Sequence, residues 1–161
     1  MEHFRYNGGY KVKKLIVMIS VLLVSALLLS ACGGKENAGF DAEKAFGRIL
    51  EEVKYGSELE DVSKAAEFSF SGVPEGTEIR FWTAADGRLA DAAILFRVQA
   101  SEELEAVKAS VEQYIAQRKT EAERYSPEEV SKLENAVKFA SGNYYIVCIT
   151  DDAVTARDVL K

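Results

Sequence analysis

The chain has 161 residues, of which 48% are hydrophobic, and a formal net charge of −6 at pH 7. After residue 31 the remaining 130 residues contain no histidine and no methionine and carry a formal charge of −9. This composition excludes Ser-His-Asp and Cys-His catalytic machinery, histidine-ligated metal sites and the basic face that general nucleic-acid binding requires.

The first 31 residues have the composition of a secretory signal peptide. Three lysines between residues 11 and 14 form a basic region, and the uncharged run Leu15 to Leu29 is shorter than the about 20 apolar residues of a membrane-spanning helix. The run ends in Leu29-Ser30-Ala31-Cys32, which resembles the lipobox of bacterial lipoproteins. This resemblance implies that Cys32 carries a diacylglycerol and becomes the first residue after cleavage. The alternative is a signal anchor with an incidental cysteine, and translation from Met1 or from Val12 is compatible with the sequence.

We therefore divide the chain into a lipoprotein signal peptide (residues 1–31), a lipidated cysteine with a flexible tether (32–40) and one folded domain (41–161). In the domain, apolar residues spaced by three and four from Phe46 to Val53 predict a helix that Asp41 caps. The acidic segment that follows, Ser57 to Ala66, predicts a second, short helix.

The next part of the chain has β-like patterns. Phe68 and Phe70 alternate with serines, which is typical of a strand. Two further strands are predicted at Ile79 to Thr83 and at Ala92 to Val98, and the Asp86-Gly87 turn between them would allow a hairpin.

Two helices are predicted after these strands. An apolar stripe from Leu104 to Ala122 indicates a long helix that runs from Ser101 to Arg124. The run Ser126-Pro127-Glu128-Glu129 predicts a new helix start, with Ser126 as N-cap and Glu129 completing a capping box. The apolar face of that helix is expected to continue to Val137.

The chain ends in a predicted strand and a predicted helix. Tyr144 to Ile149 is apolar on both alternating faces, as in a central strand, and follows a turn at residues 141–143. Asp151 or Asp152 is expected to cap the last helix. The element order predicts an α+β fold, a single small domain with a short, mainly antiparallel sheet packed against several helices.

Several runs carry a family resemblance: Ala90 to Phe96, Ser126 to Val137, and Gly142 to Val147 followed by Asp151-Asp152. Together with the long charged helix, they resemble an uncharacterised family of small lipoproteins of Gram-positive anaerobes, the domain of unknown function 4358. The resemblance covers most of the chain after the signal peptide. It implies a lipid-anchored, single-domain protein and supplies no activity, because the family has none assigned.

Few residues are candidates for a binding site, and each also has a structural explanation. Trp82, Tyr144 and Tyr145 could line a surface for a small molecule or a glycan, although neighbours in a strand point to opposite faces. Asp151 and Asp152 could supply oxygens to a cation, but helix capping explains them better.

Three other reactive side chains are expected to be structural. Cys148 lies in the apolar strand and has no histidine to activate it, so we expect it to be a buried core residue. Asp86 and Asp91 flank the predicted turn and are expected to stabilise it. We expect no catalytic residue, no metal site and no cofactor.

From these features we expect a lipid-anchored extracytoplasmic protein that acts as a non-catalytic binding or accessory module at the cell envelope. Its expected partners are the membrane, through the diacylglycerol on Cys32, and an envelope protein or small ligand of unknown identity; no nucleic acid is expected. Two alternatives stay open: a carboxylate-dependent enzyme acting on envelope glycans, and a structural envelope protein without a ligand.

Overall fold

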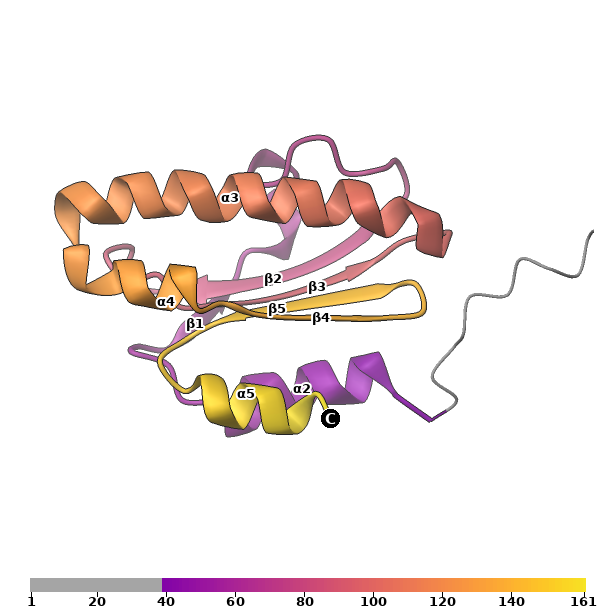
Figure 1. Cartoon of the computed structure of the whole chain (residues 1–161), viewed down its shortest axis with the longest axis horizontal. Helices are drawn as coiled ribbons and strands as arrows, with labels where there is room; N and C mark the ends of the chain where they lie inside the picture. The colour runs from indigo at the N-terminus through magenta and orange to yellow at the C-terminus, as the bar shows by residue number, and fades with distance from the viewer. Residues whose placement is uncertain (1–38) are drawn as a thin grey trace, which may run out of the picture. The chain divides into compact units, whose positions relative to one another are not determined.

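An antiparallel sheet of five strands, covered by helices on both faces, organises residues 39–161, which are the residues described by the computed structural model (Figure 1). The strand order is β1-β2-β3-β5-β4. The strands are β1 (Leu59–Asp61), β2 (Glu78–Ala84), β3 (Ala92–Arg97), β4 (Val137–Ser141) and β5 (Tyr144–Ile149). This architecture confirms the predicted α+β fold with an antiparallel sheet. The predicted signal peptide and Cys32 lie outside the described residues.

Four α-helices of the described region pack on this sheet. They are α2 (Ala42–Glu52), α3 (Leu104–Tyr125), α4 (Val130–Glu134) and α5 (Ala153–Val159). Figure 1 shows α3 and α4 on one face and α2 and α5 on the other. Short 3₁₀ helices at Ser63–Phe68, Ser101–Glu103 and Pro127–Glu129 connect the regular elements.

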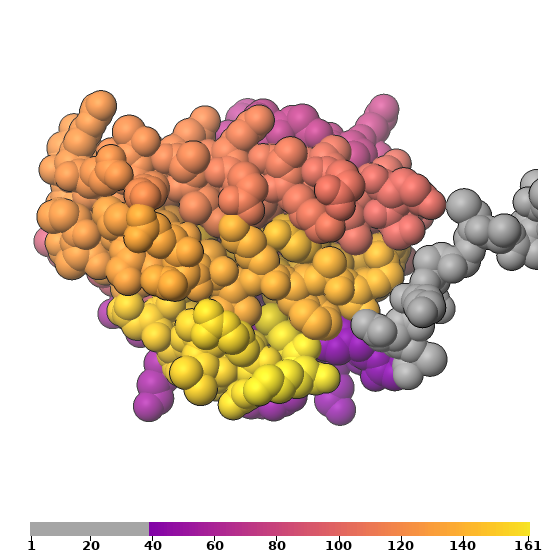
Figure 2. Space-filling view, in the orientation of Figure 1, coloured from indigo at the N-terminus to yellow at the C-terminus, as the bar shows by residue number. Residues whose placement is uncertain are grey.

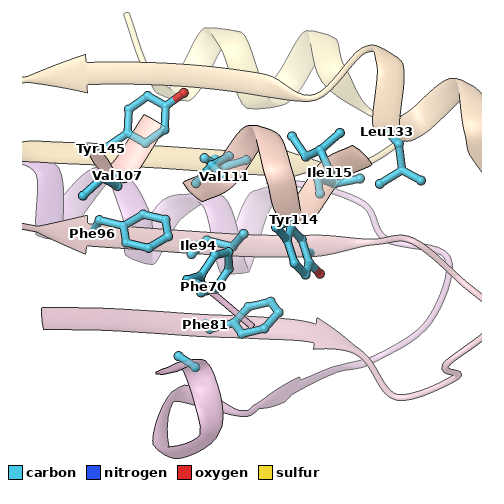
Figure 3. Close-up of a cluster of buried hydrophobic side chains, with 14 of the residues drawn as sticks. Phe70, Phe81, Ile94, Phe96, Val107, Val111, Tyr114, Ile115, Leu133 and Tyr145 are labelled. Carbon is cyan, nitrogen blue, oxygen red and sulfur yellow. The ribbon is translucent and has the colours of Figure 1, made fainter. Parts of the chain in front are cut away.

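The core between the sheet and α3 contains a cluster of aromatic rings (Figure 3). The Phe70 ring lies between the sheet and the helix, with its centroid 5.3 Å from Phe81, 5.0 Å from Phe96 and 4.9 Å from Tyr114. Tilted and edge-to-face pairs of this kind add to the free energy gained by burying the rings. The apolar stripe of α3 reaches this core through Val107 and Val111, which are fully buried.

A second core lies between the other face of the sheet and the helices α2 and α5. Phe46 and Ile49 from α2 are fully buried there and pack with Val159 from α5. Leu95 and Ile146 project into this core from the interior strands β3 and β5. Since successive strand residues face opposite sides, two buried faces require apolar residues at nearly every position, as the sequence of β5 predicted.

Several local predictions are confirmed. Asp41 caps α2, because its side chain accepts a hydrogen bond from the Lys44 backbone N–H at 3.0 Å. Asp86 accepts the Arg88 backbone N–H at 3.1 Å in the predicted turn, and the flanking strands β2 and β3 form the expected hairpin. Of the two candidates for the last cap, Asp152 caps α5.

The segment between α2 and β2 differs from its prediction. Instead of a short helix over residues 57–66, the chain forms β1 and then a 3₁₀ helix that ends at Phe68. The alternation of Phe68 and Phe70 does not form a strand either: Phe68 is 85% exposed, whereas Phe70 is 3% exposed in the aromatic core. The alternation of Phe68 and Phe70 suggested a strand with one apolar face, but only Phe70 is buried.

Two predictions for residues 126–137 are wrong. The helix α4 ends at Glu134, and Val137 begins the edge strand β4 instead of continuing a helical face. The helical segment does start after Ser126, with Pro127 in its first turn, as predicted. However, the Ser126 side chain forms no capping hydrogen bond, and Glu129 points inward and accepts the Ala90 backbone N–H at 2.8 Å. A long-range hydrogen bond has replaced the expected local capping box.

Candidate functional site

A groove of about 1210 Å³ lies between the start of α2, the strand β4 and the end of α5. Its floor is apolar and buried, formed by Ala45 of α2, Val137 of β4, and Val159 and Leu160 at the end of α5. In Figure 2 the yellow α5 lies next to the indigo beginning of α2, with the β4–β5 hairpin beside both. The groove is therefore an open depression above the second core.

Five cationic side chains line this groove: Lys44, Arg48, Lys138, Arg157 and Lys161. Lys44 and Arg48 are four residues apart, which places them on the same side of α2. Among the residues that the structure describes, Asp41 is the one acidic side chain in the lining. The groove is thus a cationic site in an acidic protein.

The cations differ in how they are paired. Arg48 is paired with Glu52 (Nε–Oε1 2.7 Å), Lys138 with Glu112 (2.5 Å) and Lys161 with Asp158 (2.6 Å). Lys44 and Arg157 are exposed and form no ion pair with another residue of the described region. These two side chains can meet an anionic ligand without giving up an existing partner.

An aromatic pair also lines the groove. The rings of Phe40 and Phe139 lie 4.6 Å apart between centroids at an angle of 48°, and both side chains are half-buried. Phe40 directly precedes the cap of α2, so this pair lies at the start of the described region. The groove combines cationic side chains with an apolar and aromatic surface.

The charge of residues 39–161 is unevenly distributed. The groove lining has a formal side-chain charge of +4, from its five cations and Asp41. The other side chains of this range include 10 lysines and arginines and 23 aspartates and glutamates, a charge of −13. The groove is a local cationic region on a strongly anionic molecule.

A separate feature is a buried ion-pair network around Lys132 of α4. The Lys132 Nζ lies 2.9 Å from Asp91 Oδ2 and 3.0 Å from Glu129 Oε2, and all three side chains are at most 6% exposed. The largely exposed Asp151, after β5, lies 3.4 Å from the same nitrogen. This network, which we call the Lys132 network, joins α4 to the start of β3 and the end of β5.

The Lys132 network corrects the prediction that Asp91 is a turn residue. Burial opposes the charged ammonium, but the hydrogen bonds to Asp91 and Glu129 outweigh it and raise the pKa of Lys132 above its ordinary value. The other carboxylate oxygen, Asp91 Oδ1, is buried and has no hydrogen-bond partner among residues 39–161. Gly56 packs against the network, because a Cβ at this position would lie 3.0 Å from Asp91 Oδ2.

Glu129 also borders a smaller cavity of about 400 Å³ that contains Arg88 and Arg118 in its lining. The Arg118 guanidinium donates a hydrogen bond to the Leu89 carbonyl at 3.0 Å, and its other nitrogen pairs with Glu121 at 3.1 Å. Arg118, which belongs to α3, therefore holds the β2–β3 loop next to this helix.

The sequence-predicted aromatic residues do not share a surface. Trp82 and Tyr144 pack against the second core, whereas Tyr145 is buried in the aromatic core on the other face. Trp82 pairs across the sheet with Ala93, and Tyr144 pairs with Arg97 at the other end of β3. Each predicted aromatic therefore has a packing role in this structure.

The predicted aspartates are neighbours with different surroundings. Asp152 accepts hydrogen bonds from the backbone N–H groups of Thr155 (3.4 Å) and Lys54 (3.2 Å). Its pKa is lowered, first by the Thr155 side chain and then by the Lys54 backbone N–H. Asp151 approaches Lys132 instead. In the region that the structure describes, no group of three or more histidine, cysteine, aspartate or glutamate side chains is arranged to hold a metal ion.

Cys148 is fully buried in β5, as predicted. Its sulfur lies 3.5 Å from the Tyr55 hydroxyl, and burial raises the pKa of the thiol to about 11. A thiol with this pKa is almost entirely protonated at neutral pH and is a poor nucleophile.

Sequence reasoning missed the groove and the Lys132 network. The groove cations come from α2, β4, α5 and Lys161 after α5, so only the folded chain brings them together. The spacing of Glu129 and Lys132 is a helical i,i+3 signal, but it does not reveal burial or the partner Asp91. Both features depend on contacts between distant parts of the chain.

Among residues 39–161, no helix combines the length and the apolar character needed to cross a bilayer. Neither the curated proteins nor the solved structures include a match to this chain. Residues 82–150, from β2 to the end of β5, match the model of a family described as a domain of unknown function, DUF4358. The match supports the resemblance to this family that the sequence motifs indicate.

Proposed function

We propose that the chain is a lipid-anchored extracytoplasmic bacterial lipoprotein whose folded domain is a non-catalytic binding module at the cell envelope. The observation that carries the proposal is the cationic groove, which offers an open volume of about 1210 Å³. Gly39 and Phe40 belong to its lining, so the groove lies where the lipobox-containing segment joins the folded domain.

The charges of the groove favour binding over carboxylate catalysis. Enzymes that use two carboxylates need both groups at the reacting bond. Within residues 39–161, the groove lining contains a single acidic side chain, Asp41, which caps α2. The buried carboxylates of Asp91 and Glu129 share the Lys132 ammonium instead of facing each other across an open cleft.

The anchor is tested by metabolic labelling with a fatty-acid precursor of the diacylglycerol. Cys32→Ala should abolish labelling and release the protein from the membrane fraction. Cys148→Ala is the matched control, because it removes the other cysteine of the chain and should leave labelling intact. Undiminished labelling of the Cys32→Ala variant would refute the anchor.

The binding role is tested against the enzymatic alternative. The purified protein is incubated with cell-wall glycan, and the release of reducing sugar ends is measured over time. We expect no release above that of heat-inactivated protein. Release that disappears in the Glu129→Gln or Asp151→Asn variant would favour a carboxylate-dependent enzyme and overturn the proposed binding role.

A further inference from the structure

We propose that the cationic groove is a docking surface for an anionic bilayer, which holds the folded domain against the membrane with this face. The proposal rests on the lipid anchor at Cys32 and adds an orientation to it. It commits to lipid phosphate groups in the membrane surface as the bound chemistry. Three features of the molecule support it: reach, charge and surface composition.

The first feature is reach. Gly39, which belongs to the groove lining, lies seven positions after Cys32. Even a fully extended chain of that length spans at most about 25 Å. An anchor at Cys32 therefore keeps Gly39, and with it this edge of the groove, within about 25 Å of the anchored cysteine.

The second feature is charge. The groove lining carries +4, whereas the remaining side chains of residues 39–161 carry −13, so an anionic bilayer attracts this face and repels the others. Lys44 and Arg157 form no ion pair within the described region and can contact lipid phosphates directly. The charge distribution therefore selects one orientation.

The third feature is the surface between the cations. Phe40 and Phe139 are half-buried in the groove, beside the buried floor of Val159 and Leu160. Phenylalanine and leucine side chains on the apolar face of interfacial segments are buried at the boundary between lipid headgroups and acyl chains. A lipid can use both parts of this surface, because its phosphate can contact the cations and its apolar part can contact the aromatic and apolar side chains. A small anion dissolved in water would use only the cations.

The test uses the full-length lipoprotein reconstituted in vesicles. One set contains phosphatidylcholine alone, and the other contains about one-third phosphatidylglycerol. An amine-reactive acetylating reagent is applied, and mass spectrometry measures the labelling rate of each lysine. We expect Lys44 and Lys161 to react at least about fivefold more slowly on the anionic vesicles, with Lys64, an exposed lysine outside the groove, unchanged.

The variant that tests the groove is Lys44→Gln/Arg157→Gln. Losing two cations near an anionic surface should weaken docking about 25-fold and abolish the protection of Lys161. The matched control, Lys64→Gln/Arg124→Gln, removes two exposed cations that form no ion pair in the described region and lie outside the groove. It should retain the protection, whereas 1 M salt should remove it in every protein through screening.

Equal lysine reactivity on the two vesicle types would overturn the docking proposal, as would an equal loss of protection in the control variant. Protection that arises on phosphatidylcholine vesicles with added glycerol phosphate, and not on anionic vesicles, would show a site for a free phosphate ester instead. Vesicle flotation separates this proposal from the anchor. Protein that floats only with Cys32 intact but shows no protection has an anchor without docking.

Discussion

Replacing Lys132 with methionine should destabilise the protein more than any exposed lysine replacement. Methionine keeps most of the side-chain length but removes the ammonium, which leaves the buried Asp91 and Glu129 without their cation. Breaking a buried ion pair by removing one partner costs about 3–5 kcal/mol. Against a typical total stability of about 5–15 kcal/mol, the melting temperature should fall by about 10–20 °C.

The Glu105–Lys108 pair provides a matched control for this experiment. Like Glu129 and Lys132, these residues pair at i,i+3 in a helical segment, at 2.7 Å, but both are exposed. Lys108→Met should therefore cost no more than about 0.5 kcal/mol. The two sites share the Glu–Lys spacing, and they differ in burial and in the second buried carboxylate, Asp91, that Lys132 holds.

A rescue variant distinguishes uncompensated charge from lost packing. In Lys132→Met/Asp91→Asn/Glu129→Gln, neutral amides replace the two carboxylates, and the amide oxygen introduced at position 129 can still accept the Ala90 N–H. This variant should recover at least half of the stability lost in Lys132→Met. Chemical denaturation followed by circular dichroism measures all four proteins. A cost below about 1 kcal/mol for Lys132→Met, or no recovery in the triple variant, would refute the reasoning.

The pH dependence follows from the raised pKa of Lys132. Because the folded state holds this proton more tightly than the unfolded state, the stabilisation is complete below the ordinary pKa of 10.5 and declines as the pH rises above it. The difference in unfolding free energy between wild type and Lys132→Met should therefore stay constant between pH 7 and 9. A difference that shrinks over this range would contradict the assignment.

Two glycines and one cysteine give further predictions. Gly56→Ala should destabilise the protein by about 1–3 kcal/mol, because the new Cβ would lie 3.0 Å from the Asp91 carboxylate. Gly47→Ala should instead stabilise the protein by about 0.5–1 kcal/mol, because a Cβ at this position of α2 meets open space. Thermal unfolding of the two variants measures whether the melting temperature falls in the first and rises in the second. The Cys148 thiol has a pKa of about 11 in the folded protein and an ordinary value of 9.0, so it ionises first in the unfolded chain. The unfolding free energy of the wild type should therefore fall by about 1 kcal/mol between pH 9 and 10 from this group. Urea unfolding of Cys148→Ala should show a smaller fall over the same pH range. Equal declines in the two proteins would rule out this contribution.

The fold class was predictable because its determinants are local. The Asp41 cap and the periodic apolar residues of α2 and α3 are visible in short stretches of sequence. The continuous apolar run of β5 indicates a strand with two covered faces, which is what the two cores provide. These signals do not depend on knowing which elements pair.

The errors lie where local signals are ambiguous. Val137 continues the helical spacing of α4, yet the same residue suits the first position of β4, and only pairing with β5 decides between them. Glu129 has the right position for a capping box but is held by Ala90, 39 residues earlier in the chain. A pattern within a few residues cannot show such a competing partner.

The candidate site was less predictable than the fold. Lys44 and Arg157 are 113 positions apart, and they line the same groove because α2 and α5 cover the same face of the sheet. Trp82, Tyr144 and Tyr145 were predicted as binding candidates, and the register of the strands places Trp82 and Tyr144 at one core and Tyr145 at the other. The grouping of side chains into a site required the strand order and register.

The two outer strands of the sheet have a consequence for association between copies of the protein. An unpaired strand edge can recruit a strand from another molecule and start aggregation. Here β1 has three residues, two of them Glu60 and Asp61, and β4 has five residues and includes Lys138. Short, charged edges of this kind oppose strand addition, so copies of the protein can be present at high local concentration without their sheets pairing edge to edge.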